Sequence, residues 1–502
     1  MKRRLASFAA GAAVWLVVAA SIVDARQGDL PYSLANEAKL ATELPIIDVD
    51  ALDAARRRAD VDPAQKADAP RDKRQRVADD NAVSITPQHD GRWSDLSDGS
   101  RLWRVRVRAG GATDLRCGFG RFALPQGATL YVIGADRYYQ GPYTAADAYI
   151  GRFQAAVVPG DLATIELRVP AGVVLAEDAL ELSSVGAGFR DAFGRDDAVK
   201  LGTPGKSGSC NVDVVCPLGR NYADDIHAVA YIEFQGDDDH DYYLCSGTLL
   251  ADVPRDRRNY FLTAAHCIDS SSEAASLIAY WNYQSTRCGT PSEPAGGYFN
   301  DDQHGAALRA SRADADFSLL ELSQAPDPAW NVYYAGWDAS GAAPPGTIGL
   351  HHPSGDVKKI TAGPAPATTD NCIDTGGGST NTHWLTGPYT QGTTEGGSSG
   401  SGLFVPAGAG SAAGRLIGTL SGGNAACNGA LPNTEHDCYG KFAAAWDGPG
   451  ATTRLRDWLD PFDSGHTGQD GGDAPAVHEP GHSRHGSPER FAERPAARAA
   501  AN

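Results

Sequence analysis

Three short strings of this sequence carry side chains that could together perform nucleophilic catalysis. Ser399 lies in the glycine-rich stretch GGSSGSG, His266 follows the apolar run in NYFLTAAHC, and Asp316 precedes the apolar run in DADFSLLEL. A serine hydroxyl is a weak nucleophile until a histidine removes its proton, and a carboxylate is needed to orient that histidine. The three strings therefore predict acyl-transfer chemistry, with Ser399 as nucleophile, His266 as base and Asp316 as the group that orients the base.

The glycine-rich stretch also indicates where the negative charge of the transition state would be bound. Glycines lack a Cβ atom, so the turn can direct several main-chain N–H groups at one substrate oxygen. We expect the N–H groups of Gly397 and Ser399 to form this oxyanion hole. The orienting carboxylate has one competitor, Asp314, but Asp316 directly precedes the apolar run FSLLEL, whereas Asp314 is interpreted as a solvated turn residue.

Two other classes of protein fit parts of this pattern. Gly396, Ser398 and Gly400 satisfy the G-x-S-x-G motif of α/β-hydrolase esterases, in which Ser398 would be the nucleophile. That fold needs its acid and then its histidine after the serine, together with strands that alternate with long helices. The sequence shows neither pattern. The second class is a catalytically silent protein that binds peptides without cutting them, and the presence of all three catalytic residue types argues against it.

The composition describes the protein that must position these residues. A chain of 502 residues predicts about two to four domains, because domains contain roughly 100 to 200 residues. The 58 glycines, the single methionine and the short strand-like segments favour a loop-rich, all-β protein. The net charge of -18 argues against a nucleic acid as the main partner, since binding phosphates requires a basic surface.

No motif predicts a metal or a cofactor. Neither C-x-x-C nor H-E-x-x-H occurs, so we expect no zinc site and no cofactor. The acidic run GDDDHD, residues 236–241, could offer oxygen ligands to calcium, but it lacks the spacing of a known calcium loop. We interpret it as a solvated hairpin tip.

The N-terminus predicts export. Residues 1–25 combine the basic start MKRR with the apolar stretch ASFAAGAAVWLVVAASIV and a small-residue cleavage pattern near Ala25, which is typical of a signal peptide. The apolar stretch is close to the minimum length of a membrane anchor, which is the alternative. We expect a cleaved signal and hence a secreted protein without membrane attachment, in which disulfide bonds can form.

Residues 26–206 are expected to be a pro-region. Its charged part, up to about residue 90, is typical of a solvated segment, whereas LWRVRVRA and the strand-like runs after it predict a small all-β domain at about 100–190. Glycine and proline mark a linker around Lys206, which would be a processing site for an enzyme that cuts after lysine. The mature chain would then start at Ser207, and the pro-region would assist folding or block the cleft.

The cysteines predict a disulfide framework. Eight of the nine lie between residues 210 and 438, an even set in a segment that is expected to be exported. Many pairings are formally possible, so the count alone does not assign partners. The ninth, Cys117, lies in the N-terminal β domain and is expected to be a free thiol, either buried or prone to exchange.

A series of strings resembles the bacterial lysyl endopeptidases, a branch of the chymotrypsin-like serine proteases. In chain order these are SGSCNVDVVCP, YFLTAAHC, YWNYQSTRC, DADFSLLELS, YAGWD, HHPSGDVKKI, TEGGSSGSGLF and DCYGKF. The resemblance implies two antiparallel β-barrels with the catalytic groups in the cleft between them, preceded by a small all-β pro-domain. We assign 207–462 to the serine protease domain, and 463–502, which has few large apolar residues, to a low-complexity tail.

The same resemblance implies three of the disulfide bonds. They are Cys210 with Cys427, Cys216 with Cys288, and Cys245 with Cys267. The last pair would staple the strand-like YYLCSGTLL to the string that carries His266. Cys372 and Cys438 are left over and could form a fourth bridge.

The resemblance also implies specificity for lysine. Trypsin-like pockets carry an aspartate six residues before the nucleophile, where this sequence has Thr393. Lysyl endopeptidases instead carry an aspartate in a D-x-Y-G string, which Asp437 in DCYG matches. Asp437 would pair with a lysine ammonium, so we expect cleavage on the carboxyl side of lysine. A trypsin-like protease that accepts both lysine and arginine is the alternative.

Two serines depart from known patterns. Ser421 stands where similar lysyl endopeptidases carry a histidine; trypsin-like enzymes have serine there, so we expect Ser421 to hydrogen-bond Asp316. Ser421, Gly422 and Gly423 should also offer a strand edge to the substrate backbone. Ser398 stands where trypsin-like enzymes have the aspartate that binds the new N-terminus, so we expect activation by uncovering of the cleft.

The expected partners are lysine-containing peptides and the protein's own pro-region, and the mature enzyme should be a monomer.

Overall fold

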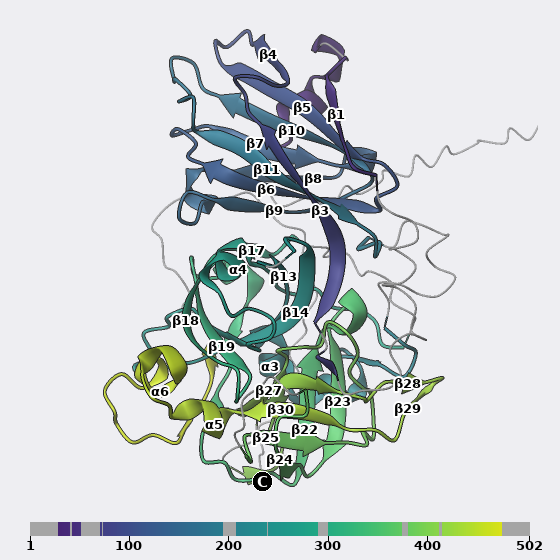
Figure 1. Cartoon of the computed structure of the whole chain (residues 1–502), viewed down its shortest axis with the longest axis vertical. Helices are drawn as coiled ribbons and strands as arrows, with labels where there is room; N and C mark the ends of the chain where they lie inside the picture. The colour runs from purple at the N-terminus through teal and green to yellow at the C-terminus, as the bar shows by residue number, and fades with distance from the viewer. Residues whose placement is uncertain are drawn as a thin grey trace, which may run out of the picture.

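The computed structural model describes residues 29–40, 43–51, 71–72, 74–193, 207–237, 239–289, 300–373, 380–410 and 414–473. These residues form a β-rich N-terminal domain, drawn at the top of Figure 1, and a larger β-rich domain below it. The expected signal peptide, residues 1–25, and Lys206 lie outside the described residues. No helix in the described part of the chain is long and apolar enough to cross a membrane.

The N-terminal domain is a sandwich of two layers. One layer has the strand order β1-β5-β10-β7-β8, with β4 paired to β5, and the other has the order β3-β11-β6-β9. The strands of the first layer are β1 (Ile46–Val49), β4 (Arg92–Asp95), β5 (Arg101–Ala109), β7 (Thr129–Ile133), β8 (Tyr139–Tyr143) and β10 (Leu162–Val169). Those of the second layer are β3 (Gln75–Ile85), β6 (Asp114–Phe122), β9 (Phe153–Pro159) and β11 (Leu180–Gly188).

Alternation of apolar and charged side chains explains the sandwich. In β5 the side chains of Val105 and Val107 are fully buried, whereas Arg106 and Arg108 are only partly buried. The valines pack into one core with Phe119 and other apolar residues of the second layer. Each buried valine contributes about 1.5 kcal/mol or more of hydrophobic stabilisation. The period-two pattern of the sequence therefore holds the two layers together.

The domain begins well before residue 100, where its start was expected. β3 lies within the charged segment that was expected to be solvated. Its charges have partners, since Nη1 of Arg76 lies 2.5 Å from Asp79 and 2.6 Å from Asp241 of the larger domain. Composition does not reveal such pairing, which is why the strand was missed. Figure 1 shows β3 extending from the N-terminal domain down along the larger domain, where it pairs with β14.

The strands from β13 to β19 of the larger domain form a nearly closed barrel. Their order is β17-β16-β13-β14-β15-β19-β18, and the two end strands follow one another in the chain across Gly305. The strands are β13 (Val229–Gln235), β14 (Tyr242–Leu249), β15 (Tyr260–Thr263), β16 (Ile278–Tyr280), β17 (Asp302–His304), β18 (Ala306–Arg312) and β19 (Phe317–Leu322).

The remaining strands of the larger domain form a second sheet with the order β12-β23-β22-β26-β27-β30-β25-β24. No pairing within the described residues joins its end strands, so one barrel is seen where the resemblance implies two. The residues between β24 and β25 are described only in part. The strands are β12 (Val212–Asp213), β22 (Gly346–His351), β23 (Lys359–Pro364), β24 (Ala367–Thr369), β25 (His383–Thr386), β26 (Gly402–Phe404), β27 (Leu416–Gly423) and β30 (Asp437–Lys441).

Short elements complete the structure. β2 (Arg71–Asp72) and β21 (Trp337–Asp338) pair with β27, and β28 (Cys427–Asn428) pairs with β29 (Leu431–Pro432). The helices are α1 (Tyr32–Ala35), α3 (Ala223–Ala228), α4 (Ser271–Ser276), α5 (Phe442–Trp446) and α6 (Arg456–Leu459).

The start of the expected tail, 463–502, is part of the larger domain. β31 (Gly468–Gln469) pairs with β21, and β32 (Gly472–Asp473) pairs with β20 (Tyr333–Tyr334). These strands contribute backbone hydrogen bonds more than apolar side chains, so composition did not mark them. Residues after Asp473 lie outside the described part of the chain.

Four disulfide bonds staple the larger domain. The bridge between Cys245 and Cys267 ties β14 to the residue after His266 and contributes roughly 3 kcal/mol in the chain-entropy model. Cys117 is free and buried, and burial raises the pKa of its thiol to about 12, so it is an unreactive core thiol. The bonds are the three pairs that the resemblance implies and the remaining pair: Cys210 with Cys427, Cys216 with Cys288, Cys245 with Cys267, and Cys372 with Cys438.

Candidate active site

Ser399, His266 and Asp316 come from three distant parts of the chain and meet at one place. The Oγ of Ser399 lies 2.7 Å from Nε2 of His266. The Nδ1 of His266 lies 2.9 Å from Oδ2 and 3.1 Å from Oδ1 of Asp316. His266 follows β15 and Asp316 immediately precedes β19, and these two strands pair with each other. This geometry allows a proton to pass from the serine to the histidine while the carboxylate stabilises the imidazolium.

Asp316 is fully buried, and several groups support its charge. Its carboxylate accepts the backbone N–H of His266 at 3.1 Å and a hydrogen bond from the side chain of Ser421. Burial alone would raise the pKa of Asp316, but the charge of His266 and these hydrogen bonds outweigh it, so the pKa lies below its usual value. The backbone φ of Asp316 is 47°, a left-handed conformation that aspartate adopts more readily than most residues.

Asp314, the competing carboxylate, has a different partner. It lies 2.5 Å from Nε of Arg312, and its side chain is 25% exposed. The structure therefore brings Asp316 rather than Asp314 to His266.

The turn around Ser399 requires glycine at two positions. Gly397 has a φ of 90° and Gly400 a φ of 76°. A Cβ on Gly397 would lie 2.2 Å from Leu244, and one on Gly400 would lie 2.1 Å from Oγ1 of Thr263. Within the described residues, the N–H groups of Gly397 and Ser399 donate to no other residue. Both are therefore available to a substrate oxygen.

Ser398, the nucleophile of the alternative esterase interpretation, supports the turn instead. It is fully buried, and its Oγ lies 2.8 Å from Nδ1 of His351. The same oxygen accepts the N–H of Glu395 at 3.1 Å. These contacts fix the turn. The hydroxyl of Ser399, rather than that of Ser398, lies within hydrogen-bonding distance of Nε2 of His266.

Asp437 lies buried on β30, beside the end of β27. Its Oδ2 accepts hydrogen bonds from the hydroxyls of Tyr389 at 3.0 Å and Thr394 at 2.5 Å, and its Oδ1 accepts the N–H of Ala425 at 3.3 Å. In the pairing of β30 with β27, Asp437 lies opposite Gly423. A buried carboxylate next to this strand edge is chemically suited to a cationic side chain.

Ser421 connects Asp316 to a histidine that no sequence motif marks. The Oγ of Ser421 lies 3.0 Å from Nε2 of His383, while Nδ1 of His383 lies 2.9 Å from the hydroxyl of Thr382. Burial lowers the pKa of His383 to about 4, despite the nearby charge of Asp316, so the ring is neutral at neutral pH. His383 thus approaches the carboxylate through Ser421, the position at which similar endopeptidases carry a histidine. The serine at position 421, in place of that histidine, was the one feature of the sequence that pointed to a histidine elsewhere near Asp316.

Replacing Ser421 with alanine should lower kcat by about tenfold, because a hydrogen bond to a charged group contributes about 1.5 kcal/mol or more. KM for a small lysine ester should change little. His383→Gln should change kcat less than about threefold, because glutamine also offers a neutral N–H donor. Steady-state kinetics of both variants would measure these changes. A loss of kcat in His383→Gln as large as that in Ser421→Ala would contradict the view that His383 acts as an uncharged hydrogen-bond donor.

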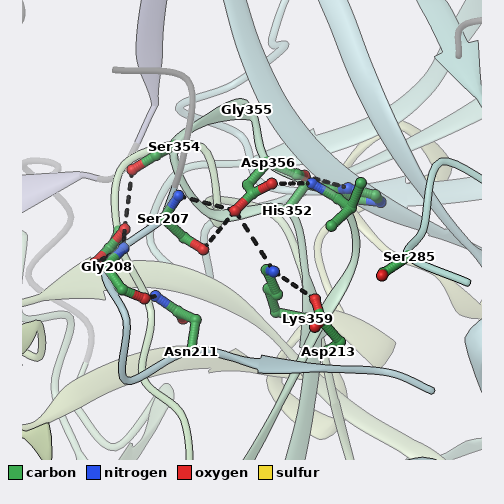
Figure 2. Close-up of polar contacts among 12 residues, drawn as sticks. Ser207, Gly208, Asn211, Asp213, Ser285, His352, Ser354, Gly355, Asp356 and Lys359 are labelled. Atoms are coloured by element: carbon green, nitrogen blue, oxygen red, sulfur yellow. Dashed lines mark hydrogen bonds and ion pairs between the residues drawn. The ribbon is translucent and has the colours of Figure 1, made fainter. Parts of the chain in front are cut away.

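The residue expected at the mature N-terminus lies against a buried carboxylate. Figure 2 shows Ser207 beside Asp356, whose Oδ2 lies 2.9 Å from the backbone nitrogen and 2.7 Å from Oγ of Ser207. Asp356 is 2% exposed, and the same oxygen lies 3.5 Å from Nζ of Lys359. The next N–H, that of Gly208, donates to the carboxylate of Glu395 at 3.1 Å.

This arrangement bears on one sequence-based expectation. Ser398 was expected to leave the freed N-terminus without a carboxylate partner. In the structure, the carboxylate of Asp356, from a different place in the chain, accepts the backbone N–H of Ser207. A comparison of single positions with trypsin-like enzymes could not reveal this contact. Glu395 then links the N-terminal residues to the start of the turn that carries Ser399.

The acidic run 236–241 is not entirely a solvated hairpin tip. Asp241 is 5% exposed and binds Arg76 at 2.6 Å and the N–H of Asp80 at 3.0 Å. The hydroxyl of Tyr243 donates to Asp239 at 2.5 Å. The described residues contain no cluster of side chains that could hold a metal ion. Asp241 therefore serves as a contact to the N-terminal domain.

Comparison with known proteins gives a consistent result over both domains. A family model for the lysyl endopeptidase N-terminal domain matches residues 48–186, and one for the lysyl endopeptidase C-terminal domain matches residues 204–440. A curated lysyl endopeptidase of Pseudomonas aeruginosa is 33% identical over 372 residues, which cover 70% of this chain and 75% of that protein.

The chain also has similarities to solved protease structures. An HtrA-type protease with a tripeptide is 16% identical, with a TM-score of 0.29, and the match covers 45% of this chain and 59% of that one. The Rv3671c protease from M. tuberculosis in its active form is 16% identical, with a TM-score of 0.30 and coverage of 47% and 86%.

Proposed function

The chain belongs to the lysyl endopeptidase family of serine endopeptidases, and on this premise we propose that it is a secreted enzyme that cleaves on the carboxyl side of lysine. One observation carries the proposal. His266 lies between Ser399 and Asp316 at hydrogen-bonding distance from each, in a domain that also buries the carboxylate of Asp437.

The reaction would proceed through an acyl-enzyme. His266 accepts the proton of Ser399 as Oγ attacks the scissile carbonyl, and the N–H groups of Gly397 and Ser399 bind the oxyanion. His266 then gives the proton to the leaving amine, and later activates the water that hydrolyses the ester. Asp316 holds the imidazole with its Nδ1 proton facing the carboxylate. Its lowered pKa supports this role, because the carboxylate stays ionised at neutral pH.

Specificity would come from Asp437. A lysine ammonium placed there forms a charge pair within a site in which Tyr389 and Thr394 already donate to the carboxylate. A neutral side chain supplies no counter-charge, and a buried charge that loses its partner costs about 3–5 kcal/mol. The edge of β27, from Ser421 to Gly423, would pair with the substrate backbone.

The domain organisation follows the same proposal. The second sheet would be the second barrel of a chymotrypsin-like fold, because Ser399 lies three residues before its strand β26, whereas His266 and Asp316 border the first barrel. Residues 26–206 would be the pro-region, the part from Ser207 onward the mature enzyme, and residues 1–25 a signal for secretion.

Cleavage after Lys206 would convert the amide nitrogen of Ser207 into an α-ammonium. This nitrogen already lies 2.9 Å from Asp356 (Figure 2). Asp356→Asn should therefore destabilise the mature form by about 3 kcal/mol more than the proenzyme, because only the mature form carries an α-ammonium that loses its carboxylate. Lys359, which also contacts Asp356, keeps Asp213 at 2.5 Å in both forms. Urea unfolding of both forms would measure this, with Ser399→Ala present to prevent self-digestion and added active enzyme used to produce the mature form.

Asp447→Asn is the matched control, because Asp447 pairs with Arg456 at 3.0 Å but its side chain is 68% exposed. It should change the free energy of unfolding of either form by less than about 1 kcal/mol. Equal destabilisation of mature and uncut protein by Asp356→Asn would contradict the N-terminal ion pair.

The proposed function is tested with matched esters of lysine, arginine and norleucine. Purified mature protein should hydrolyse the lysine ester, and a serine-directed acylating inhibitor should abolish that activity. Comparable rates with arginine would favour a trypsin-like specificity instead, and absence of hydrolysis of all three would identify a silent protein.

A further inference from the structure

The two N–H donors proposed for the oxyanion hole are held in different ways. Each N–H belongs to a planar trans peptide, so the carbonyl of the same peptide points in the opposite direction. A hydrogen bond to that carbonyl therefore sets the direction of the N–H. For the donor of Ser399 the carbonyl is that of Ser398, which accepts the N–H of Ser401 at 3.1 Å. This donor is fixed within its own turn.

The donor of Gly397 depends on a distant segment. The carbonyl of its peptide is that of Gly396, which accepts the N–H of Ser354 at 2.5 Å. Both residues that flank this peptide are glycines, and without a Cβ atom they restrict its rotation very little. A hydrogen bond from outside the turn is therefore needed to give the Gly397 N–H one direction.

Gln75 supplies a second donor only while the N-terminal region is attached. With its amide oriented to satisfy its partners, Gln75 donates to the carbonyl of Gly396 at 3.2 Å. Gln75 belongs to the proposed pro-region, residues 26–206, and would leave with it. The mature enzyme would then hold this carbonyl through Ser354.

Ser354 has an uncommon backbone conformation. Its φ is 55° and its ψ is 24°, in the left-handed region, which costs a residue with a side chain about 1–2 kcal/mol. Conformations of this kind persist where the surrounding structure determines them, and they occur often at functional sites. Here the conformation places the N–H of Ser354 on the carbonyl of Gly396.

Two contacts hold Ser354 in this conformation. The N–H of Asp356 donates to the carbonyl of Pro353 at 2.9 Å, which closes the tight turn around Ser354. The Oγ of Ser354 donates to Oε2 of Glu395 at 2.9 Å. The same carboxylate accepts the N–H of Gly208 at 3.1 Å, and Figure 2 shows Ser354 close to Gly208. The chain next to the proposed mature N-terminus thus supports the turn of Ser354.

Resting on the function proposed above, we propose that Ser354 is a positioning residue for the reaction, whose backbone N–H aims the N–H of Gly397 at the substrate oxygen. Ser354 acts through Gly396 and does not touch the reacting atoms. The left-handed backbone is the essential feature, and the hydroxyl adds support through Glu395. Ser354 should therefore influence kcat rather than the binding of lysine.

Two substitutions separate the backbone from the hydroxyl. Ser354→Thr keeps a hydroxyl but is β-branched, which disfavours the left-handed region. Ser354→Gly has no hydroxyl but adopts this region freely. In purified mature enzyme, Ser354→Thr should lower kcat for a lysine peptide amide by about tenfold or more, because loss of a whole oxyanion donor lowers kcat by about 100-fold or more. Ser354→Gly should lower kcat by less than about threefold.

Two inhibitors report separately on the oxyanion hole and on the lysine pocket. A peptide aldehyde that ends in lysinal forms a tetrahedral adduct with Ser399, and the oxygen of this adduct enters the oxyanion hole. Its affinity should fall in Ser354→Thr by the same factor as kcat/KM. Butylamine carries the cation without a carbonyl, so its inhibition constant should stay within about twofold of the native value.

Asn331→Thr is the matched control. Asn331 also has a left-handed backbone, with a φ of 53°, and it is exposed and lies outside the turn of Ser399. Threonine there introduces the same kind of strain. It should lower the midpoint of thermal unfolding but leave kcat within about twofold of the native value.

Equal losses of kcat in Ser354→Thr and Ser354→Gly would overturn the inference, because the hydroxyl would then be responsible. A loss of less than about threefold in Ser354→Thr, or equal weakening of the aldehyde and butylamine, would overturn it as well. If Ser354→Thr does not fold, Ser354→Asn decides, because asparagine also adopts the left-handed region and a loss above about tenfold would contradict the inference. In each of these cases the native enzyme still cleaves the lysine amide, so the proposed function stands. If the native mature enzyme leaves the amide intact, the proposed function fails and this inference fails with it.

Discussion

Ser399→Ala is expected to lower kcat by about 10⁶-fold, the scale seen when a triad serine is removed from a serine protease. The physical reason is that the variant removes the hydroxyl that lies 2.7 Å from Nε2 of His266 in the native protein. KM for a lysine ester should change much less, since the groups proposed to bind the substrate remain. Single-turnover kinetics with active-site titration would measure the loss.

Ser398→Ala is the informative comparison, because Ser398 is the nucleophile of the esterase alternative. Its hydroxyl supports the turn through His351, so we expect a loss of less than about 100-fold from poorer positioning. Near-native activity of Ser399→Ala, or a larger loss in Ser398→Ala, would contradict the assignment of the nucleophile.

Asp437→Asn is expected to lower kcat/KM for a lysine ester by about 10³-fold. The variant removes the proposed partner of the lysine ammonium, and burying an ammonium without its partner costs about 3–5 kcal/mol, with 1.4 kcal/mol for each factor of ten. The norleucine ester, which is neutral and of similar length, should be hydrolysed at least as fast by the variant as by the native enzyme.

Glu435→Gln is the matched control, since Glu435 lies two residues earlier and is exposed. It should leave the ratio of lysine to norleucine hydrolysis unchanged. An Asp437→Asn enzyme that keeps its preference for lysine would show that another group determines specificity.

The sequence was sufficient to locate the candidate site because the residues proposed to be catalytic lie in compact strings. Ser399, His266 and Asp316 each border an apolar run that becomes a strand, so the chemistry and the local structure could be predicted together. Asp316 could be preferred over Asp314 for the same reason, and the structure brings Asp316 to His266.

Other groups could not be predicted, because their roles depend on contacts between distant segments. His383 lies on β25 without a motif and is linked to Asp316 by hydrogen bonds through Ser421. Asp356 meets Ser207 across 149 positions of sequence.

The same limit applies to the fold. The charged run before residue 90 was expected to be solvated, yet Arg76 finds its partner in Asp241 of the other domain, and β3 forms there. The short strands β31 and β32 extend the larger domain into the expected tail, although their sequence has few apolar residues. Local patterns predict strands with buried alternating faces, but not strands that are held by long-range polar pairing.

The most direct test of the account is the C-terminal sequence of peptides released from a denatured protein by the purified mature enzyme. If the proton relay of His266, Asp316 and Ser399 operates beside a pocket that ends in Asp437, nearly all new C-termini should be lysine. New C-termini distributed over several residue types, or split evenly between lysine and arginine, would contradict the assignment of Asp437 as the lysine-binding carboxylate.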